Sequence, residues 1–382
     1  MKLVEVNHPK LEKKFLKLSQ TMYANNQAYI QPLEKDIKQV FDPSKNKYFR
    51  NGAAIRWILE DANGQVIGRV AAFTNKSMAR AHRQPTGGMG FFECIDNQKA
   101  ANLLFDAAKE WLQEQGMEAM DGPINFGDRN NWWGLLVDGF HEPNYQVPFN
   151  HYYYKALFEN YGFETLFKQY TYKRPMGGEV GLDDKMYRRA KGPMSNPDYT
   201  FRHLTKKEYK KLPDYFLTVY NKAWAGHQGV KAMSKIQAEA TFKQMKPIAD
   251  SKLLWFAFYK EEPIAFFISI PELNQLYKHL DGQWGLWSKL KFYYLLKTGV
   301  CKKALGIVFG VVPEHQRKGI ESALIIAYTK MAWEKNFQYK DLEMNWIGDF
   351  NPKMMRVVEQ IGGKIHKTHI TYRLSFNNNQ ES

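Results

Sequence analysis

Residues 306–324 have the pattern of a phosphate-binding turn. Their sequence, GIVFGVVPEHQRKGIESAL, predicts a buried strand, a tight loop that contains Gly319, and a helix that begins after this glycine. The start of such a helix presents free backbone N–H groups and the positive end of the helix dipole to one point. This arrangement suits an anion such as a pyrophosphate, and Arg317 and Lys318 add positive charge beside it. The alternative is a strand–turn–helix whose glycine only relieves backbone strain.

The same segment resembles the acyl-CoA-binding motif of the GNAT superfamily of N-acyltransferases. In that family a strand ending Val-x-Pro leads into Gln/Arg-x-x-Gly-x-Gly/Ala, and here Gln316 and Gly319 follow Val311 and Pro313. A later segment that begins at Asn351 and closes at Gly362 is similar to a second family helix. The resemblance implies acetyl-CoA or a longer acyl-CoA as co-substrate. The cofactor-binding residues that it implies are Val311, Val312, Gln316, Arg317, Lys318, Gly319, Ile320, Ser322 and Asn351.

Three residues depart from the family pattern. Glu321 stands where the family has Gly or Ala, so a carboxylate lies close to the expected diphosphate. Val358 occupies the position at which many members have a tyrosine that protonates the departing thiolate, and Gly363 replaces the usual Phe. These departures leave a second hypothesis open, in which the chain is a catalytically silent GNAT-fold ligand-binding or regulatory protein.

Transfer of an acyl group to an amine requires a general base or a water relay that removes a proton from the nitrogen. Glu343 and Asn345 lie on one face of the strand predicted beside the cofactor strand, which makes Glu343 the candidate catalytic residue. A solvated carboxylate at the edge of the sheet is the alternative interpretation. Tyr328 and His315 are weaker candidates, because each is equally typical of core packing or of a surface loop.

The order of predicted strands and helices occurs twice along the chain. Hairpin turns at 61–64 and 260–263 precede long helices at 97–115 and 319–336, and later helices end at Gly162 and Gly362. The repetition favours a tandem duplication. We therefore expect an α/β fold (a mixed α+β sheet) with two tandem GNAT-like acyl-CoA N-acyltransferase domains. Residues 1–175 are assigned to a degenerate first domain, 176–197 to a linker and 198–382 to the acyl-CoA-binding domain.

The first copy lacks the phosphate-binding pattern. Its corresponding loop, ECIDNQKA at 93–100, has no glycine and no basic pair, so we expect no CoA binding there. Loop aromatics are instead the candidates for the acceptor site, and they are Trp132 and Trp133 in the first copy and Trp224 and His227 in the second. A loop that packs on its own aromatic residues is the alternative for Trp132 and Trp133.

Residues 284–297 combine leucine, tryptophan and tyrosine on one predicted helical face with lysines near it. Such a helix suits peripheral contact with a membrane surface or the cover of a lipid-like acceptor. A helix packed across the interface between the two domains is the plainer alternative.

The formal net charge is +15, and it is unevenly distributed. Residues 1–175 have 22 basic and 19 acidic side chains, whereas residues 176–382 have 32 and 20. An anionic cofactor accounts for part of the excess in the second half. No segment matches a nucleic-acid motif, so we expect no nucleic-acid partner.

Cys94 and Cys301 are too few for a disulfide framework or a structural zinc site, so we expect a reducing compartment and no metal. No apolar signal stretch or run of membrane-spanning length is present, and we expect a cytoplasmic protein without a transmembrane segment. The expected function is CoA-dependent N-acyl transfer, of the N-acetyltransferase type, to a small-molecule or peptide amine.

Overall fold

The structure is a computed structural model that describes residues 1–75, 84–177, 181–224 and 232–376. The elements of the first half are β1 (Lys2–Glu5), α1 (Pro9–Met22), α2 (Glu34–Val40), η1 (Lys47–Arg50), β2 (Gly52–Glu60), β3 (Val66–Asn75), β4 (Thr86–Cys94), α4 (Gln98–Glu114), β5 (Ala119–Gly122), β6 (Leu135–Asp138), α5 (Tyr154–Tyr161) and β7 (Glu164–Pro175). The elements of the second half are α6 (Asp184–Ser195), β8 (Tyr199–His203), η2 (Lys206–Lys210), α7 (Leu212–Trp224), α8 (Lys235–Met245), η3 (Ser251–Leu253), β9 (Leu254–Tyr259), β10 (Glu262–Pro271), α9 (Asn274–Tyr277), α10 (Leu286–Lys297), β11 (Lys303–Val311), η4 (Pro313–His315), α11 (Ile320–Ala332), β12 (Asp341–Gly348), α12 (Pro352–Gln360) and β13 (Lys364–Ser375).

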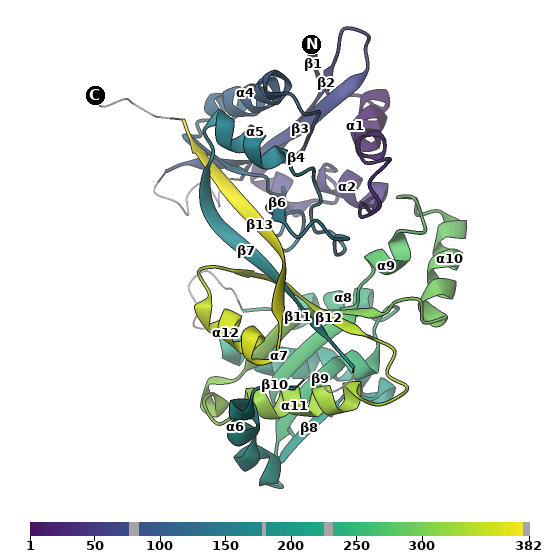
Figure 1. Ribbon diagram of the computed structural model, residues 1–382, viewed down its shortest axis with the longest axis vertical. Helices are drawn as coiled ribbons and strands as arrows, with labels where there is room; N and C mark the ends of the chain where they lie inside the picture. Colours follow the sequence, from purple (N-terminus) through teal and green to yellow (C-terminus); the bar gives the residue numbers. More distant parts are fainter. Residues whose placement is uncertain (76–83, 178–180, 225–231, 377–382) are drawn as a thin grey trace.

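One mixed sheet runs through both halves (Figure 1). The strand order is β1-β2-β3-β4-β5-β13-β7-β12-β11-β10-β9-β8, and β6 pairs with β13 beside this path. The pairs β4–β5 and β11–β12 are parallel, and the other pairs are antiparallel. The predicted α/β class with a mixed sheet is confirmed.

Local sequence signals set the ends of several elements in the way that the sequence analysis expects. The side chain of Asp61 accepts hydrogen bonds from the backbone N–H groups of Asn63 and Gln65, which closes the β2–β3 hairpin. Asn97 caps α4 by accepting a hydrogen bond from the N–H of Ala100. Gly162 ends α5 with a left-handed φ of 106°, a conformation that favours glycine.

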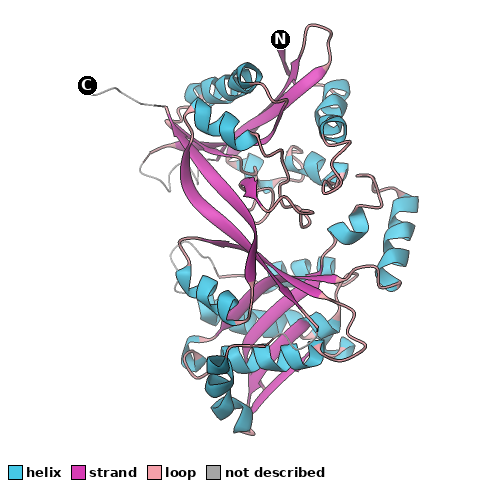
Figure 2. Cartoon of the chain, viewed as in Figure 1, coloured by secondary structure: helices cyan, strands magenta, loops and turns pink. Residues whose placement is uncertain are grey.

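The last strand of each half pairs with strands of the other half. β13 lies between β5 and β7, and β7 lies between β13 and β12. The side chains follow: Tyr172 of β7 belongs to the core of the second half, and Tyr372 of β13 belongs to the core of the first half. The long β7–β13 pair is visible at the centre of Figure 2 as two twisted strands that join the halves. The domain boundaries at 175 and 198 stay predictions.

Two segments differ from the sequence-based expectation. The expected linker 176–197 contains α6, whose Met186, Ala190 and Pro193 are buried in the core of the second half. Pro193 and the neighbouring Gly192 hide the helical pattern, because both residues normally disfavour a helix. The expected loop 126–147 contains the short strand β6, which β13 holds by non-local pairing. Among the described residues, no helix is both long and apolar enough to cross a bilayer.

We predict that Tyr372→Ala destabilises the whole chain, because this side chain of β13 fills the core of the first half. Its ring packs 5.6 Å from that of Phe158, and its hydroxyl donates to Glu159 Oε1 at 3.1 Å. Loss of a buried aromatic ring costs about 3–5 kcal/mol. Urea unfolding followed by circular dichroism should give that loss in a single transition. Tyr372→Phe, the control, should lose only about 0.5–1.5 kcal/mol. Two separate transitions, with only one shifted by Tyr372→Ala, would contradict the shared-core interpretation.

Candidate functional site

The parallel strands β11 and β12 diverge where the glycine-containing motif begins. They pair from Lys303 opposite Asp341 to Gly306 opposite Met344. Farther along, β11 remains paired with β10 up to Val311, and β12 remains paired with β7 up to Gly348. The polar groups of β11 that face away from β10 therefore have no strand partner beyond Gly306.

A groove of about 410 Å³ lies at the carboxyl end of β11. Its walls come from β11, from the loop before α11, and from α7, α11 and α12. The lining residues are Ala223, Phe309, Gly310, Val311, Gln316, Arg317, Glu321, Asn351, Lys353, Met354 and Val357. The apolar lining residues come mainly from β11 and α12, and the charged ones are Arg317, Glu321 and Lys353.

Backbone geometry explains the glycine of the motif. Gly319 has a φ of +80° at the start of α11, and a Cβ there would lie 2.0 Å from the carbonyl oxygen of Arg189 in α6. Any side chain would therefore collide with α6, which itself packs against α11. The loop is further fixed by Gln316, whose Nε2 donates to the carbonyl of Val311 at 3.0 Å.

Four of the residues that the resemblance implies as cofactor contacts lie together in this groove: Val311, Gln316, Arg317 and Asn351. Val312, Gly319, Ile320 and Ser322 are buried beneath the loop, and Lys318 is exposed outside the lining. Asn351 also caps α12, because its side chain accepts a hydrogen bond from the N–H of Met354 at 3.2 Å. Cofactor binding by these residues stays a prediction.

The charges in the groove have mixed sign. Arg317 and Lys353 are the cations of the lining, and Glu321 is its carboxylate. Lys353 is not part of the family motif, although its place directly after Asn351 and Pro352, in the first turn of α12, is a usable signal. Glu321 does line the groove, as its position in the motif suggests. An anionic ligand would meet two cations, one carboxylate and the positive start of α11.

The other two departures from the family pattern are explained by packing. Val358 is fully buried in the core of the second half, and its neighbour Val357 lines the groove instead. A Cβ on Gly363 would lie 2.6 Å from Cγ1 of Val358 and 3.2 Å from Cε of Met344. A phenylalanine at position 363 therefore has no room. Among the described lining residues, none is a tyrosine or a histidine.

Glu343 lies in a buried cluster of charges rather than at a sheet edge. The alternative of a solvated strand-edge carboxylate is wrong, because β7 covers the other side of β12 and the side chain is fully buried. Its Oε2 lies 2.8 Å from Nζ of Lys303, and its Oε1 accepts hydrogen bonds from Lys367 and, at 2.8 Å, from Asn144. The cluster thus ties β12 to β11, β13 and the segment after β6.

The same cluster makes Glu343 a weak base. Burial alone would raise the pKa of Glu343, but the ammonium groups of Lys367 and Lys303 outweigh that effect and lower the pKa to about 2. The carboxylate is therefore ionised at neutral pH and engaged through both oxygens. Its catalytic role stays a prediction. Tyr328 is buried against Trp255 and Phe267, and His315 contacts the hydroxyl of Tyr199, so neither lines the groove.

The two acceptor candidates of the first copy, Trp132 and Trp133, lie in different surroundings. Trp132 lines a cavity in the first half. Trp133 is buried in a core cluster with Phe73 and Phe126, as the alternative of a loop packed on its own aromatics expects for this residue. Trp224 is the last residue of α7, and His227 lies outside the described residues.

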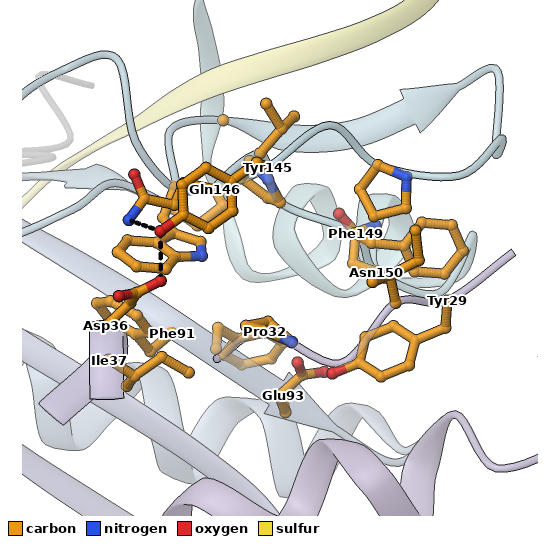
Figure 3. Close-up of a pocket in the computed structure, with 18 of the residues that line it drawn as sticks. Tyr29, Pro32, Asp36, Ile37, Phe91, Glu93, Tyr145, Gln146, Phe149 and Asn150 are labelled. Carbon is orange, nitrogen blue, oxygen red and sulfur yellow. Dashed lines mark hydrogen bonds between the residues drawn. The ribbon is translucent and has the colours of Figure 1, made fainter. Parts of the chain in front are cut away.

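The cavity beside Trp132 is small, with a volume of about 90 Å³, and it is lined mostly by aromatic and apolar side chains (Figure 3). Two carboxylates, Asp36 and Glu93, belong to its wall. Asp36 Oδ2 accepts a hydrogen bond of 2.6 Å from the hydroxyl of Tyr145. Glu93 accepts from the hydroxyls of Tyr23 and Tyr154 and pairs with Arg69 at 3.3 Å. Burial raises the pKa of both carboxyls.

The first half lacks the opening that β11 and β12 leave in the second. β4 and β5 also stop pairing early, at Gly88 opposite Asp121. There, however, the chain itself occupies the space: the N–H of Ile124 donates to the carbonyl of Met89 at 2.8 Å. A Cβ on Gly90 would lie only 1.8 Å from the carbonyl oxygen of Ile124.

We predict that Glu343→Gln destabilises the protein by about 3–5 kcal/mol at neutral pH, because two buried ammonium groups lose their counter-charge. The folded-state pKa of Glu343 is below the unfolded value of about 4.3. The carboxylate therefore stabilises the fold above the unfolded pKa, and this contribution is lost as the pH falls toward 2. Urea unfolding at pH 7 and pH 3 should show a smaller difference between the two proteins at pH 3. An equal difference at both pH values would contradict the cluster.

Comparisons with known proteins agree on the fold. No protein-family model matches the chain. It is 24% identical to "Bacterial ceramide synthase" of Caulobacter vibrioides (strain NA1000 / CB15N) over 381 residues, with 97% of each chain covered. It is 23% identical to "Protein YghO" of Escherichia coli (strain K12) over 375 residues, with 94% of this chain and 92% of the relative covered.

Two solved structures resemble the model over 98% of its length, each with a TM-score of 0.53 and 12% identity. One is a tandem GNAT protein from the clavulanic acid biosynthesis pathway, of which 98% is covered. The other contains a GCN5-related glucosamine N-acetyltransferase region of a fungal multi-domain β-N-acetylglucosaminidase, of which 38% is covered. The chain therefore has the GNAT fold, in two tandem copies.

Proposed function

We propose that this chain is an acyl-CoA-dependent N-acyltransferase, that its second half binds the acyl donor, and that its acceptor is an amphiphilic amine. One observation carries the proposal. The positive start of α11, Arg317 and Lys353 converge in a groove at the end of β11, a strand whose parallel partner has turned away. This combination gives a diphosphate a cationic site and gives an amide-containing arm an unpaired strand edge.

The cationic lining of the groove and the unpaired part of β11 indicate which acyl donor the groove would bind. A diphosphate would lie against the loop before α11, and the amide groups of a pantetheine arm would pair with the free polar groups of β11. The thioester carbonyl would then meet backbone N–H groups, which stabilise the oxyanion that forms during attack. The amine nitrogen attacks the acyl carbon, the C–S bond breaks, and CoA leaves as the thiol after it receives a proton.

The acceptor class rests on the curated relative and on the cavity. Ceramide is an amide of a long-chain amine, so the relative named a ceramide synthase points to transfer onto a lipid amine. The first-half cavity offers the carboxylate of Asp36 among aromatic side chains, a setting that suits an ammonium group, whereas Glu93 is already paired with Arg69, which lines the same cavity. Between acetyl-CoA and a longer acyl-CoA, the same relative favours the longer donor.

Glu343 is better suited to position the site than to remove the proton. Its pKa near 2 makes it a weak acceptor, and its two lysines occupy both oxygens. We therefore assign it the role of holding β11 against β12 up to the point where the strands diverge. Water that enters the groove is the remaining route for the proton.

A second function, a catalytically silent binding protein, is favoured by one specific observation. Glu321 places a carboxylate inside the groove, and the described lining holds no tyrosine or histidine to act as acid or base. Such a protein would bind its ligand without turnover.

A reducing compartment, and with it a cytoplasmic location, is part of the proposal. Cys94 and Cys301 are free, buried thiols, and burial raises the pKa of each to about 12. Neither is therefore a reactive thiolate at neutral pH.

We predict that acetyl-CoA and longer acyl-CoA raise the melting temperature, and that Arg317→Glu reduces the shift. A ligand at 100 times its Kd adds about 2.7 kcal/mol of stability, and a chain of 382 residues gains about 1–2 °C per kcal/mol. Lys330→Glu is the matched control, because it makes the same charge change at an exposed residue in the last turn of α11, outside the lining. Gly319 is a poor choice for this test, since any side chain there collides with α6.

Differential scanning fluorimetry measures the shift, and mass spectrometry of a mixture with a long-chain amine measures the amide product. Absence of a shift with every CoA thioester, or an equal loss in Arg317→Glu and Lys330→Glu, would contradict the donor site. A shift without any amide product would favour the second function.

A further inference from the structure

Helix α10 exposes an unusual amount of apolar surface. Leu286, Trp287, Leu290, Tyr293 and Tyr294 are between 41% and 82% exposed, although all five are large hydrophobic or aromatic residues. The helix stands at the outer edge of the molecule in Figure 1, beside α9. Single exposed apolar residues are common, but five on one helix of twelve residues form a patch that calls for a partner.

The five side chains occupy one face. At 3.6 residues per turn they fall within an arc of about 120°, and Lys289 and Lys291 flank that arc on its two sides. Lys297 lies near the middle of the same arc, at the last turn. An apolar face bordered by lysines is typical of a helix that lies in the plane of a membrane interface, because the lysine stems cross the apolar layer while the ammonium groups reach the headgroups.

The opposite face of α10 is anchored to the protein. Phe292, the buried residue of the helix, stacks on Tyr277 at 5.2 Å and packs against Trp284 at 5.4 Å. Nζ of Lys35 lies 4.1 Å over the ring of Trp284. Two residues before Trp284, the carbonyl of Gly282 accepts a hydrogen bond of 3.0 Å from the N–H of Glu34. The inner side of the segment that carries α9 and α10 thus packs against both halves. The outer, apolar face of α10 is not covered by any of the described residues.

We propose that α10 docks this chain on the surface of an anionic phospholipid bilayer, with Trp287, Leu290 and Leu286 inserted at the level of the headgroups. Charge complementarity favours an anionic bilayer as the binding partner of α10. The patch carries Lys289, Lys291 and Lys297 and no carboxylate within the helix, and the whole chain has a net charge of +15. Lys291 already donates to the carbonyl of His279 at 2.6 Å, so Lys289 and Lys297 are the two lysines of the helix available to lipid headgroups. A second copy of the same face would bring these lysines against one another, whereas anionic lipids attract each of them.

The docked helix stands next to the first-half cavity. Phe292 stacks on Tyr277, whose ring is 4.9 Å from that of Tyr145, and Tyr145 donates to Asp36 in the cavity wall. If the acceptor is an amphiphilic amine, a point that rests on the proposed function, docking brings the cavity to the membrane in which this amine is dissolved. The docking itself depends only on α10.

Co-sedimentation of the full-length protein with lipid vesicles tests the proposal. We expect binding to vesicles of phosphatidylcholine with phosphatidylglycerol to exceed binding to pure phosphatidylcholine by about tenfold or more, since each lysine near an anionic surface contributes about fivefold. Trp287→Asp with Leu290→Asp should lower the affinity for anionic vesicles by at least about tenfold. Lys289→Glu with Lys297→Glu should reduce it to the level seen with phosphatidylcholine alone.

Ile236→Asp is the matched control, because Ile236 is an equally exposed apolar residue, at 79%, on the separate helix α8. It should bind vesicles as the unchanged protein does. The melting temperature without ligand shows that each variant is folded. Failure of the unchanged protein to sediment with anionic vesicles, equal binding by the Trp287/Leu290 variant, or a dimer that this variant abolishes without any vesicle binding would overturn the proposal.

The acyl-CoA melting shift separates the two proposals. Loss of vesicle binding in an α10 variant that keeps the acyl-CoA shift supports docking as a function of α10 alone. Vesicle binding by a protein that shows no acyl-CoA shift would leave docking in place and contradict the proposed function.

Discussion

The antiparallel pairing of β7 with β13 is the interaction on which the rest of the structure depends. β7 is the last strand of the first half in sequence but pairs with the sheet of the second half, and β13 does the reverse. Tyr172 of β7 therefore packs in the core of the second half, and Tyr372 of β13 packs in the core of the first. The cluster around Glu343 lies at this junction, with Lys367 contributed by β13. A buried ion group of this kind is stabilising only while all its members stay in place. Separation of the halves would thus expose two cores and leave buried charges unpaired.

The local parts of the fold were predictable from the sequence. Turn residues such as Asp61 and Gly64 act through neighbours within a few residues, and their patterns are visible without the structure. The strand–loop–helix around Gly319 is also visible in the sequence, although its contact with Arg189 of α6 is not. The strand exchange was not predictable, because a strand with alternating apolar residues looks the same whichever half supplies its partner. For the same reason the sequence left open the alternative of a solvated edge position for Glu343, because its burial depends on β7, which pairs with β12 from far along the chain.

The two halves have diverged at the same structural point. In the second half, divergence of β11 from β12 opens a groove with cationic residues at its end. In the first half, the segment around Ile124 occupies the corresponding place, and the small cavity with Asp36 and Glu93 lies beside it. The segment that carries α9 and α10 belongs to the second half but rests on α2 of the first, and Asn274 of α9 lines the same cavity.

The central claim is that one half binds acyl-CoA and the other does not. Isothermal titration calorimetry of the full-length protein with CoA tests it most directly, because the method counts sites. The account predicts one CoA per chain, with binding weakened by Arg317→Glu and unaffected by Lys330→Glu. Two sites per chain, or a single site that Arg317→Glu leaves unchanged, would contradict it.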